Sequence, residues 1–138
     1  MTRLGRFYAD GEAAAPALVL TEALSFWGGI EVETGSIISR SHPQLGQCVA
    51  GRILVMPGSR GSSSSSSVLA EAVRRGTAPV GILLGSPDPI LTVGAIVAQS
   101  LYDLRCPIVV CAVDGIATGD SIRISRSQTG EAVIELSR

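Results

Sequence analysis

The sequence predicts a mixed α/β domain in which a β-rich first half packs on, or closes, a small β-α-β-α-β layer. Three short apolar runs in the second half are typical of strands buried on both faces: 53–56, 80–84 and 108–113. Helical spacing of apolar residues between these runs favours parallel strands joined by right-handed crossovers. A chain of 138 residues suffices for one domain with a real core, so we expect a single domain, 1–138.

Strand signals dominate the N-terminal half. Two short strand candidates flank a turn signal at Asp10-Gly11. The segment 26–38 contains a Gly-Gly and a Thr-Gly turn signal around short β-branched stretches, which we interpret as further strands. A strand from Arg52 to Met56 then ends at Pro57.

Two helices and a hairpin are expected in the second half. After a run of six serines, Ser62 to Ser67, apolar residues recur at helical spacing as far as Gly76, which lies where a helix C′ glycine belongs. Asp88 is placed to cap a second helix, from Ile90 to about Tyr102, which is apolar almost all round and is therefore expected to be well buried. The tail alternates polar and apolar residues around a turn at 128–130, which predicts a closing hairpin.

Composition excludes several classes of protein. The net charge is −1 and the eleven basic residues are scattered, so the sequence offers neither a basic stripe for nucleic acid nor a polybasic segment for a membrane. Its apolar stretches are too short for a transmembrane helix and its start does not resemble a signal peptide, so we expect a cytoplasmic protein. All basic residues are Arg, which excludes a Schiff-base lysine, a Ser–Lys dyad and a P-loop lysine.

Few side chains suggest a metal site or a strong base. His42 is the only histidine, so the usual two- or three-His metal sites cannot form within one chain. His42 precedes a proline in a polar segment, and we expect it in a surface loop rather than as a catalytic base. The three cysteines are interpreted as buried free thiols in a reducing cytosol: Cys48, Cys106 and Cys111.

The only tryptophan, Trp27, precedes two glycines. The preferred interpretation is an aromatic ring that packs over a tight turn. The alternative is a ligand contact, with Gly28 and Gly29 as candidate substrate-binding residues.

The strongest candidate site is the segment PGSRGSS, residues 57–63, which leaves a buried strand and enters the start of a helix. The first N–H groups of a helix have no intrahelical partner, so they can bind a carboxylate or phosphate. Arg60 could add a bidentate contact to such an anion. The segment does not fit the P-loop, dinucleotide-binding or hydrolase nucleophile patterns. From the residues alone, anion binding and a purely structural helix cap are equally supported.

Three segments resemble the small subunit of aconitase X, the swivel-domain partner of an iron-dependent hydro-lyase: 25–38, 49–79 and 88–98. The resemblance extends from about Gly5 to Arg126 and is most specific in the glycine-serine segment. It implies a β/β/α swivelling domain, as in the mobile domain of aconitases.

The resemblance also implies roles for the serine segment. In aconitases, a Gly-Ser-Ser-Arg loop reaches over the iron-sulfur site, and its first serine, as an alkoxide, removes the substrate proton. Gly61-Ser62-Ser63-Ser64 resembles that loop, which assigns the catalytic base to Ser62 and substrate contacts to Gly61, Ser63 and Ser64. Ser64 replaces the arginine of the aconitase loop, so Arg60 or a residue of the partner would hold the substrate carboxylate. The remaining serines, 65–67, are expected to form only the first helical turn.

The resemblance implies an iron or iron-sulfur cluster as cofactor, held by the large subunit, with none bound by this chain alone. It also implies that the large subunit is the partner, in a heterodimer or a multiple of it. Bacterial relatives resemble cis-3-hydroxy-L-proline dehydratases, which eliminate water to give Δ1-pyrroline-2-carboxylate, and archaeal relatives resemble phosphomevalonate dehydratases. The lysine-free composition is typical of a GC-rich genome and favours the first substrate. The alternatives are a stand-alone anion-binding regulatory module and a structural adaptor whose serine run is a solvated linker.

Overall fold

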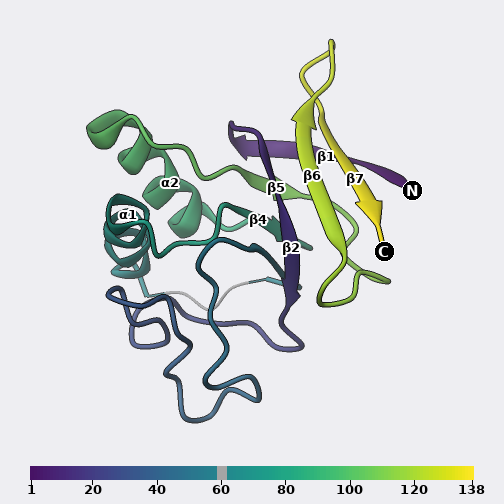
Figure 1. Cartoon of the computed structure of the whole chain (residues 1–138). Helices are drawn as coiled ribbons and strands as arrows, with labels where there is room; N and C mark the ends of the chain where they lie inside the picture. The colour runs from purple at the N-terminus through teal and green to yellow at the C-terminus, as the bar shows by residue number, and fades with distance from the viewer. Residues whose placement is uncertain (59–61) are drawn as a thin grey trace.

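The computed structural model describes residues 1–58 and 62–138, in which seven strands form a closed barrel with two helices on one side (Figure 1). The helices are α1 (Ser65–Arg75) and α2 (Pro89–Tyr102). The strands are β1 (Thr2–Ala9), β2 (Ala13–Val19), β3 (Ile53–Met56), β4 (Gly81–Leu84), β5 (Ile108–Val110), β6 (Ser121–Arg126) and β7 (Ala132–Ser137). Around the barrel they follow the order β1-β5-β4-β3-β2-β6-β7.

The predicted β-α-β-α-β layer is confirmed. Strands β3, β4 and β5 are parallel neighbours, and α1 and α2 are the crossovers between them. Every residue of β3 and β4 is buried, as expected for strands covered on both faces. The tail forms the predicted hairpin, in which β6 and β7 pair along six residues each.

Alternate residues of β3 build two cores. Leu54 and Met56 face the helices and join a cluster that includes Leu69 of α1 and Leu91 of α2. Their neighbours point the other way, into the barrel. That second cluster contains Ile53, Val55, Leu83, Val109, Ile122, Ile124 and Ile134.

The β-rich half closes the barrel, but only its two ends form strands. Strand β1 pairs with β5 and β7, while β2 pairs with β3 and β6, so the two strands beside Gly11 lie apart from each other in the sheet. The prediction of strands within 26–38 is wrong. Between residues 20 and 52, all of them described, no strand forms, and the β-structure consists of single bridge residues such as Leu24 and the pairs Ile30–Ile37 and Ser36–Cys48. The reason is the repeated left-handed backbone at glycines, with φ of 76° at Gly28 and 81° at Gly35.

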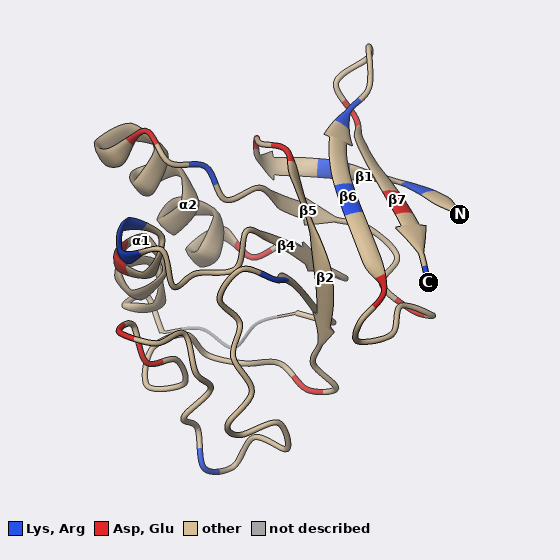
Figure 2. Ribbon diagram, in the orientation of Figure 1, with Lys and Arg blue, Asp and Glu red and all other residues tan. Residues whose placement is uncertain are grey.

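Helix α2 is only partly buried, which corrects the expectation of a helix covered on all sides. Its buried stripe consists of small residues and one leucine: Leu91, Gly94, Ala95 and Ala98. The opposite face is exposed, with Ile96 at 50% and Leu101 at 66%. The helix carries no charged residue along its length (Figure 2). It packs on α1 and the sheet from outside, so only one stripe can meet the core. Within the described part of the chain, neither helix is long and apolar enough to cross a bilayer.

Two expectations for single side chains are corrected. His42 is buried, at 7% exposure, because its ring bridges two backbone groups. The Gln44 N–H donates to His42 Nδ1 at 3.1 Å, which leaves the proton on Nε2 to be donated to the Glu22 carbonyl at 3.1 Å. Cys106 and Cys111 are buried as predicted, whereas Cys48 is exposed because it lies in the looped segment 20–52.

Candidate functional site

The serine segment forms the entry to α1. The carbonyls of its first three described residues accept hydrogen bonds from the helix start. Ser65 N–H donates to Ser62 O at 2.9 Å, Ser66 N–H to Ser63 O at 3.3 Å and Val68 N–H to Ser64 O at 3.2 Å. Ser62 is half-buried, whereas Ser63 and Ser64 are exposed. Arg60 and Gly61 lie outside the described residues. The serine run is therefore a structured turn that leads into a helix.

The hydroxyl of Ser62 lies at the start of α1. The Ser64 N–H donates to Ser62 Oγ at 3.3 Å, so a helix-terminal amide already contacts this oxygen. Ser64 is the N-cap residue by position, yet its own side chain makes no capping bond. The first turn of α1 contains no acidic residue, so nothing in that turn offsets the positive end of the helix dipole.

The start of α2 differs in this respect. Asp88 Oδ1 accepts hydrogen bonds from Ile90 N–H at 2.9 Å and Leu91 N–H at 3.1 Å, so a carboxylate of the chain occupies that helix end. Both helices begin at the carboxyl edge of the parallel strands, the edge at which open α/β sheets bind ligands. Of the two helix starts, only that of α1 is free of a capping carboxylate.

The turn at Trp27 lies against the serine segment. Trp27 N–H donates to Ser65 Oγ at 3.1 Å, and Ser65 is only 2% exposed. The structure thus brings Gly28 and Gly29 beside the start of α1, although they precede it by more than thirty residues. Glycine is required at position 29, because a Cβ there would lie 2.0 Å from Ser25 O. Trp27 is 58% exposed, so packing over the turn covers less than half of the residue.

A hollow of about 480 Å³ adjoins this turn. It is lined mainly by hydroxyls, glycines and an imidazole: Ser25, Gly28, Gly29, Ser39, Ser41 and His42. Both ring nitrogens of His42 already have partners in the backbone, so the imidazole orders the loop and is not free to act as a base.

Sequence reasoning missed Ser65, the residue that joins the turn to the helix. Position 65 shares one helix face with Leu69, Ala72 and Val73, all of which are buried. The helical spacing of these residues predicts that Ser65 is buried, and a buried polar side chain needs a hydrogen-bond partner.

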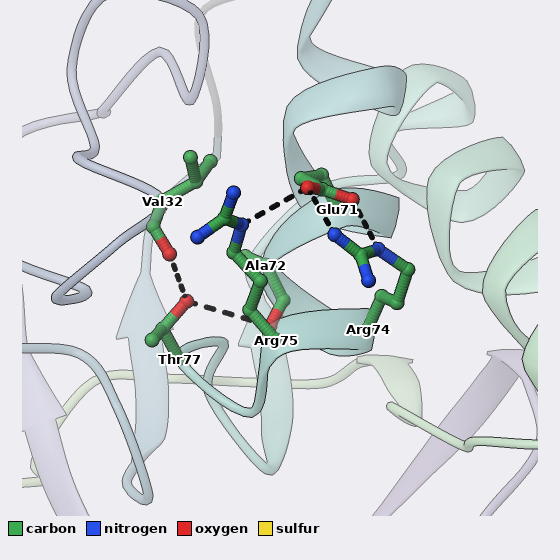
Figure 3. Close-up of polar contacts among 6 residues, drawn as sticks. All are labelled: Val32, Glu71, Ala72, Arg74, Arg75 and Thr77. Atoms are coloured by element: carbon green, nitrogen blue, oxygen red, sulfur yellow. Dashed lines mark hydrogen bonds and ion pairs between the residues drawn. The ribbon is translucent and has the colours of Figure 1, made fainter.

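The far end of α1 carries a separate charge cluster (Figure 3). Glu71 pairs with Arg74 at 2.6 Å and with Arg75 at 3.0 Å. Hydrogen bonds from these two guanidinium groups lower the pKa of Glu71 to about 2. The cluster lies more than one helical turn from Ser65, on an exposed face, and stabilises the helix surface rather than the serine segment.

The described residues do not fit a metal centre. No three His, Cys, Asp or Glu side chains gather there in a way that could hold a metal ion. Burial raises the pKa of Cys106 to about 12 and also raises that of Cys111, so neither thiol is poised to form the thiolate that binds iron.

Comparisons with known proteins identify the family of the chain. Residues 3–134 match the family model described as the aconitase X swivel domain. The chain is 46% identical over 98 residues to a cis-3-hydroxy-L-proline dehydratase of Pseudomonas aeruginosa, across 71% of this chain and 17% of that protein. It is also 46% identical over 85 residues to the phosphomevalonate dehydratase small subunit of Methanopyrus kandleri, across 62% of this chain and 63% of that one.

A solved structure extends the match to the whole fold. The crystal structure of Thermococcus kodakaraensis aconitase X in its holo-form aligns with a TM-score of 0.84 and 32% identity, over 98% of both chains. The predicted swivelling-domain fold is thereby confirmed. Because the family model covers nearly all of the sequence and the solved structure nearly all of the fold, the chain belongs to the aconitase X swivel-domain family.

Proposed function

We propose that this chain is the small subunit of an iron-dependent aconitase X-type hydro-lyase and that Ser62 is its catalytic base. The observation that carries the proposal is the position of Ser62 Oγ at the start of α1, 3.3 Å from the Ser64 amide. Membership of a family whose relatives are named dehydratases supports the same reaction class.

The helix start explains how a hydroxyl could act as a base. A serine alkoxide is too unstable in water to serve, so its charge has to be stabilised in place. The Ser64 N–H and the positive end of the α1 dipole act on Ser62 Oγ, and the first turn adds no opposing carboxylate. In the proposed step the alkoxide takes a proton from carbon, the electron pair of that C–H bond forms the double bond, and the neighbouring C–O bond breaks. The departing hydroxide takes up a proton from solvent to become water, and Ser62 later returns its own proton to solvent.

The large subunit completes the site in this proposal. It supplies the iron centre and the remaining substrate contacts, and the complex works in the cytoplasm. The exposed, uncharged face of α2 supports a permanent partner, since such contacts are more apolar than ordinary surface. Replacing Ile96, which is 50% exposed on that face, by Glu tests its part in assembly: we expect less co-purified large subunit and an unchanged isolated fold.

We propose cis-3-hydroxy-L-proline as the substrate and Δ1-pyrroline-2-carboxylate as the product. The two relatives compared are equally identical to this chain, so the choice rests on the arginine-only composition. Phosphomevalonate is the alternative, and an open helix start suits its phosphate as well as a carboxylate. Assays of the purified complex on both compounds in parallel decide between them.

The central experiment compares Ser62→Ala with Ser67→Ala, an exposed serine in the first turn of α1. In complex with the large subunit, we expect Ser62→Ala to abolish turnover while bound iron and co-purification stay at wild-type levels. The Ser67→Ala control should keep full activity. Full activity of Ser62→Ala would remove Ser62 from the mechanism.

A stand-alone anion-binding module remains the second candidate, favoured by the open start of α1. Calorimetry of the isolated chain with inorganic phosphate distinguishes the two functions. Tight binding without any partner would favour the regulatory module, whereas activity and bound iron only in the complex would favour the hydro-lyase.

A further inference from the structure

We propose that Ser65 is a positioning residue whose buried hydroxyl locks the Trp27–Gly29 turn to the serine segment, so that the two move as one unit. The kinetic part of this inference rests on the proposed function. The coupling itself rests only on the contacts of Ser65.

Ser65 bonds to both parts at once. Its backbone N–H donates to Ser62 O at 2.9 Å, and its side-chain oxygen accepts the Trp27 N–H at 3.1 Å. The residue is 2% exposed, so water cannot readily replace either partner. One residue therefore connects the carbonyl of the proposed base to the glycine turn.

Ser25 completes a closed circuit of hydrogen bonds. Ser25 Oγ donates to Trp27 O at 3.1 Å and lies 3.4 Å from Ser65 Oγ. With the Ser65 hydroxyl donating to Ser25 Oγ, each hydroxyl gives one hydrogen bond and accepts one, and both backbone groups of Trp27 are bound. Such a circuit loses more than one bond when a member is removed, because its bonds strengthen one another.

The turn is also fixed at the other end of α1. Thr77 Oγ1 donates to Val32 O at 2.6 Å, next to the last turn of the helix (Figure 3). The segment 27–32 is thus tied to both ends of an 11-residue helix, about 16 Å long. Because it is held at two points, the segment cannot shift at Trp27 without a change at the start of α1.

We therefore expect loss of the Ser65 hydroxyl to change the position of Ser62, although Ser62 itself is not altered. The Trp27 N–H would lose its acceptor, and the turn and the serine segment would relax relative to each other. Small displacements of a reacting group lower the rate strongly, so we expect Ser65→Ala to lower kcat by about tenfold to a hundredfold with little change in KM.

Trp27 is the only tryptophan, so its fluorescence reports the turn in the isolated full-length chain. We expect Ser65→Ala to lower the fluorescence anisotropy of Trp27 and to increase its quenching by acrylamide. Ser67→Ala, an exposed serine two positions later, should change neither signal. A purely structural role would lower the melting temperature without moving kcat in the complex.

The double variant tests the circuit. If Ser25 and Ser65 act together, Ser25→Ala/Ser65→Ala should affect kcat and quenching hardly more than Ser65→Ala alone. Ser25→Ala also serves as the test if Ser65→Ala does not fold. Wild-type quenching and wild-type kcat in whichever of these single variants folds would overturn the proposal. Activity of Ser62→Ala would overturn the proposed base instead, while the quenching data would still decide whether the turn is coupled.

Discussion

Helices α1 and α2 approach each other closely at Gly94. Gly94 lies on the buried stripe of α2, directly over the first turn of α1. A Cβ at this position would lie 2.7 Å from Ser66 O and 3.2 Å from Leu69 Cβ. Carbon–oxygen contacts usually need about 3.3–3.6 Å, so Gly94→Ala requires the helices to separate by roughly half an ångström or more.

Two opposing effects set the magnitude. Alanine favours a helix over glycine by about 1 kcal/mol. Overpacking costs about 1–3 kcal/mol, and we take the upper part of this range because the obstructing atom belongs to the backbone and cannot rotate away. The net loss is about 1–2 kcal/mol. At roughly 2.1 cal/mol/K per residue over 138 residues, this loss lowers the melting temperature by about 3–7 °C.

Thermal unfolding followed by circular dichroism measures this shift. Ser100→Ala is the matched control, because it lies on the exposed face of the same helix and should leave the melting temperature equal or slightly higher. A Gly94→Ala variant as stable as wild type, or more stable, would show that the helices do not approach as closely as described. Since Ser66 lies within the run Ser62–Ser67, we also expect a lower kcat in the complex.

Three further predictions concern single side chains. At pH 8, we expect Cys48 to react with a thiol reagent in the native chain, whereas Cys106 should stay unmodified until urea is added. The reason is that burial raises the pKa of Cys106 to about 12. Fast labelling of more than one thiol in the native chain would contradict this burial. Glu71→Gln should lower the melting temperature slightly at pH 7. Because the guanidinium groups lower the Glu71 pKa from 4.5 to about 2, the difference from wild type should disappear as the pH falls through that interval, and a difference that persists below it would refute the ion pairs as its source. Asp88→Ala should cost about 1–2 kcal/mol in chemical denaturation by removing two capping bonds, while Asp88→Asn keeps most of the stability; equal losses in both variants would count against capping.

The sequence predicts the βαβαβ layer well because its signals are local. Apolar runs, an N-cap aspartate at 88 and a C′ glycine at 76 each specify the element in which they occur. Both helices and the three parallel strands accordingly end within about three residues of their expected limits. The serine segment could be placed at a helix start by the same reasoning.

The segment 20–52 could not be predicted in this way, because distant residues determine its path. The bonds Trp27–Ser65 and Val32–Thr77 join residues 38 and 45 positions apart. No local pattern in the segment reveals these partners. The prediction that α2 is fully buried failed for a related reason. The hydrophobicity of a helix face indicates that the face is apolar, but it does not indicate whether the same chain covers it.

The closed barrel restricts how other proteins can attach to this domain. Each of the seven described strands has a neighbour on both sides, so β1 and β7, which would be edges in an open sheet, pair with each other. Among the described residues, a partner strand therefore finds no strand with one whole side unpaired, the kind of edge that β-augmentation extends. We therefore expect any partner to attach mainly through side chains on helices and loops, where a mutation can weaken binding without disturbing the hydrogen bonds that hold the barrel together.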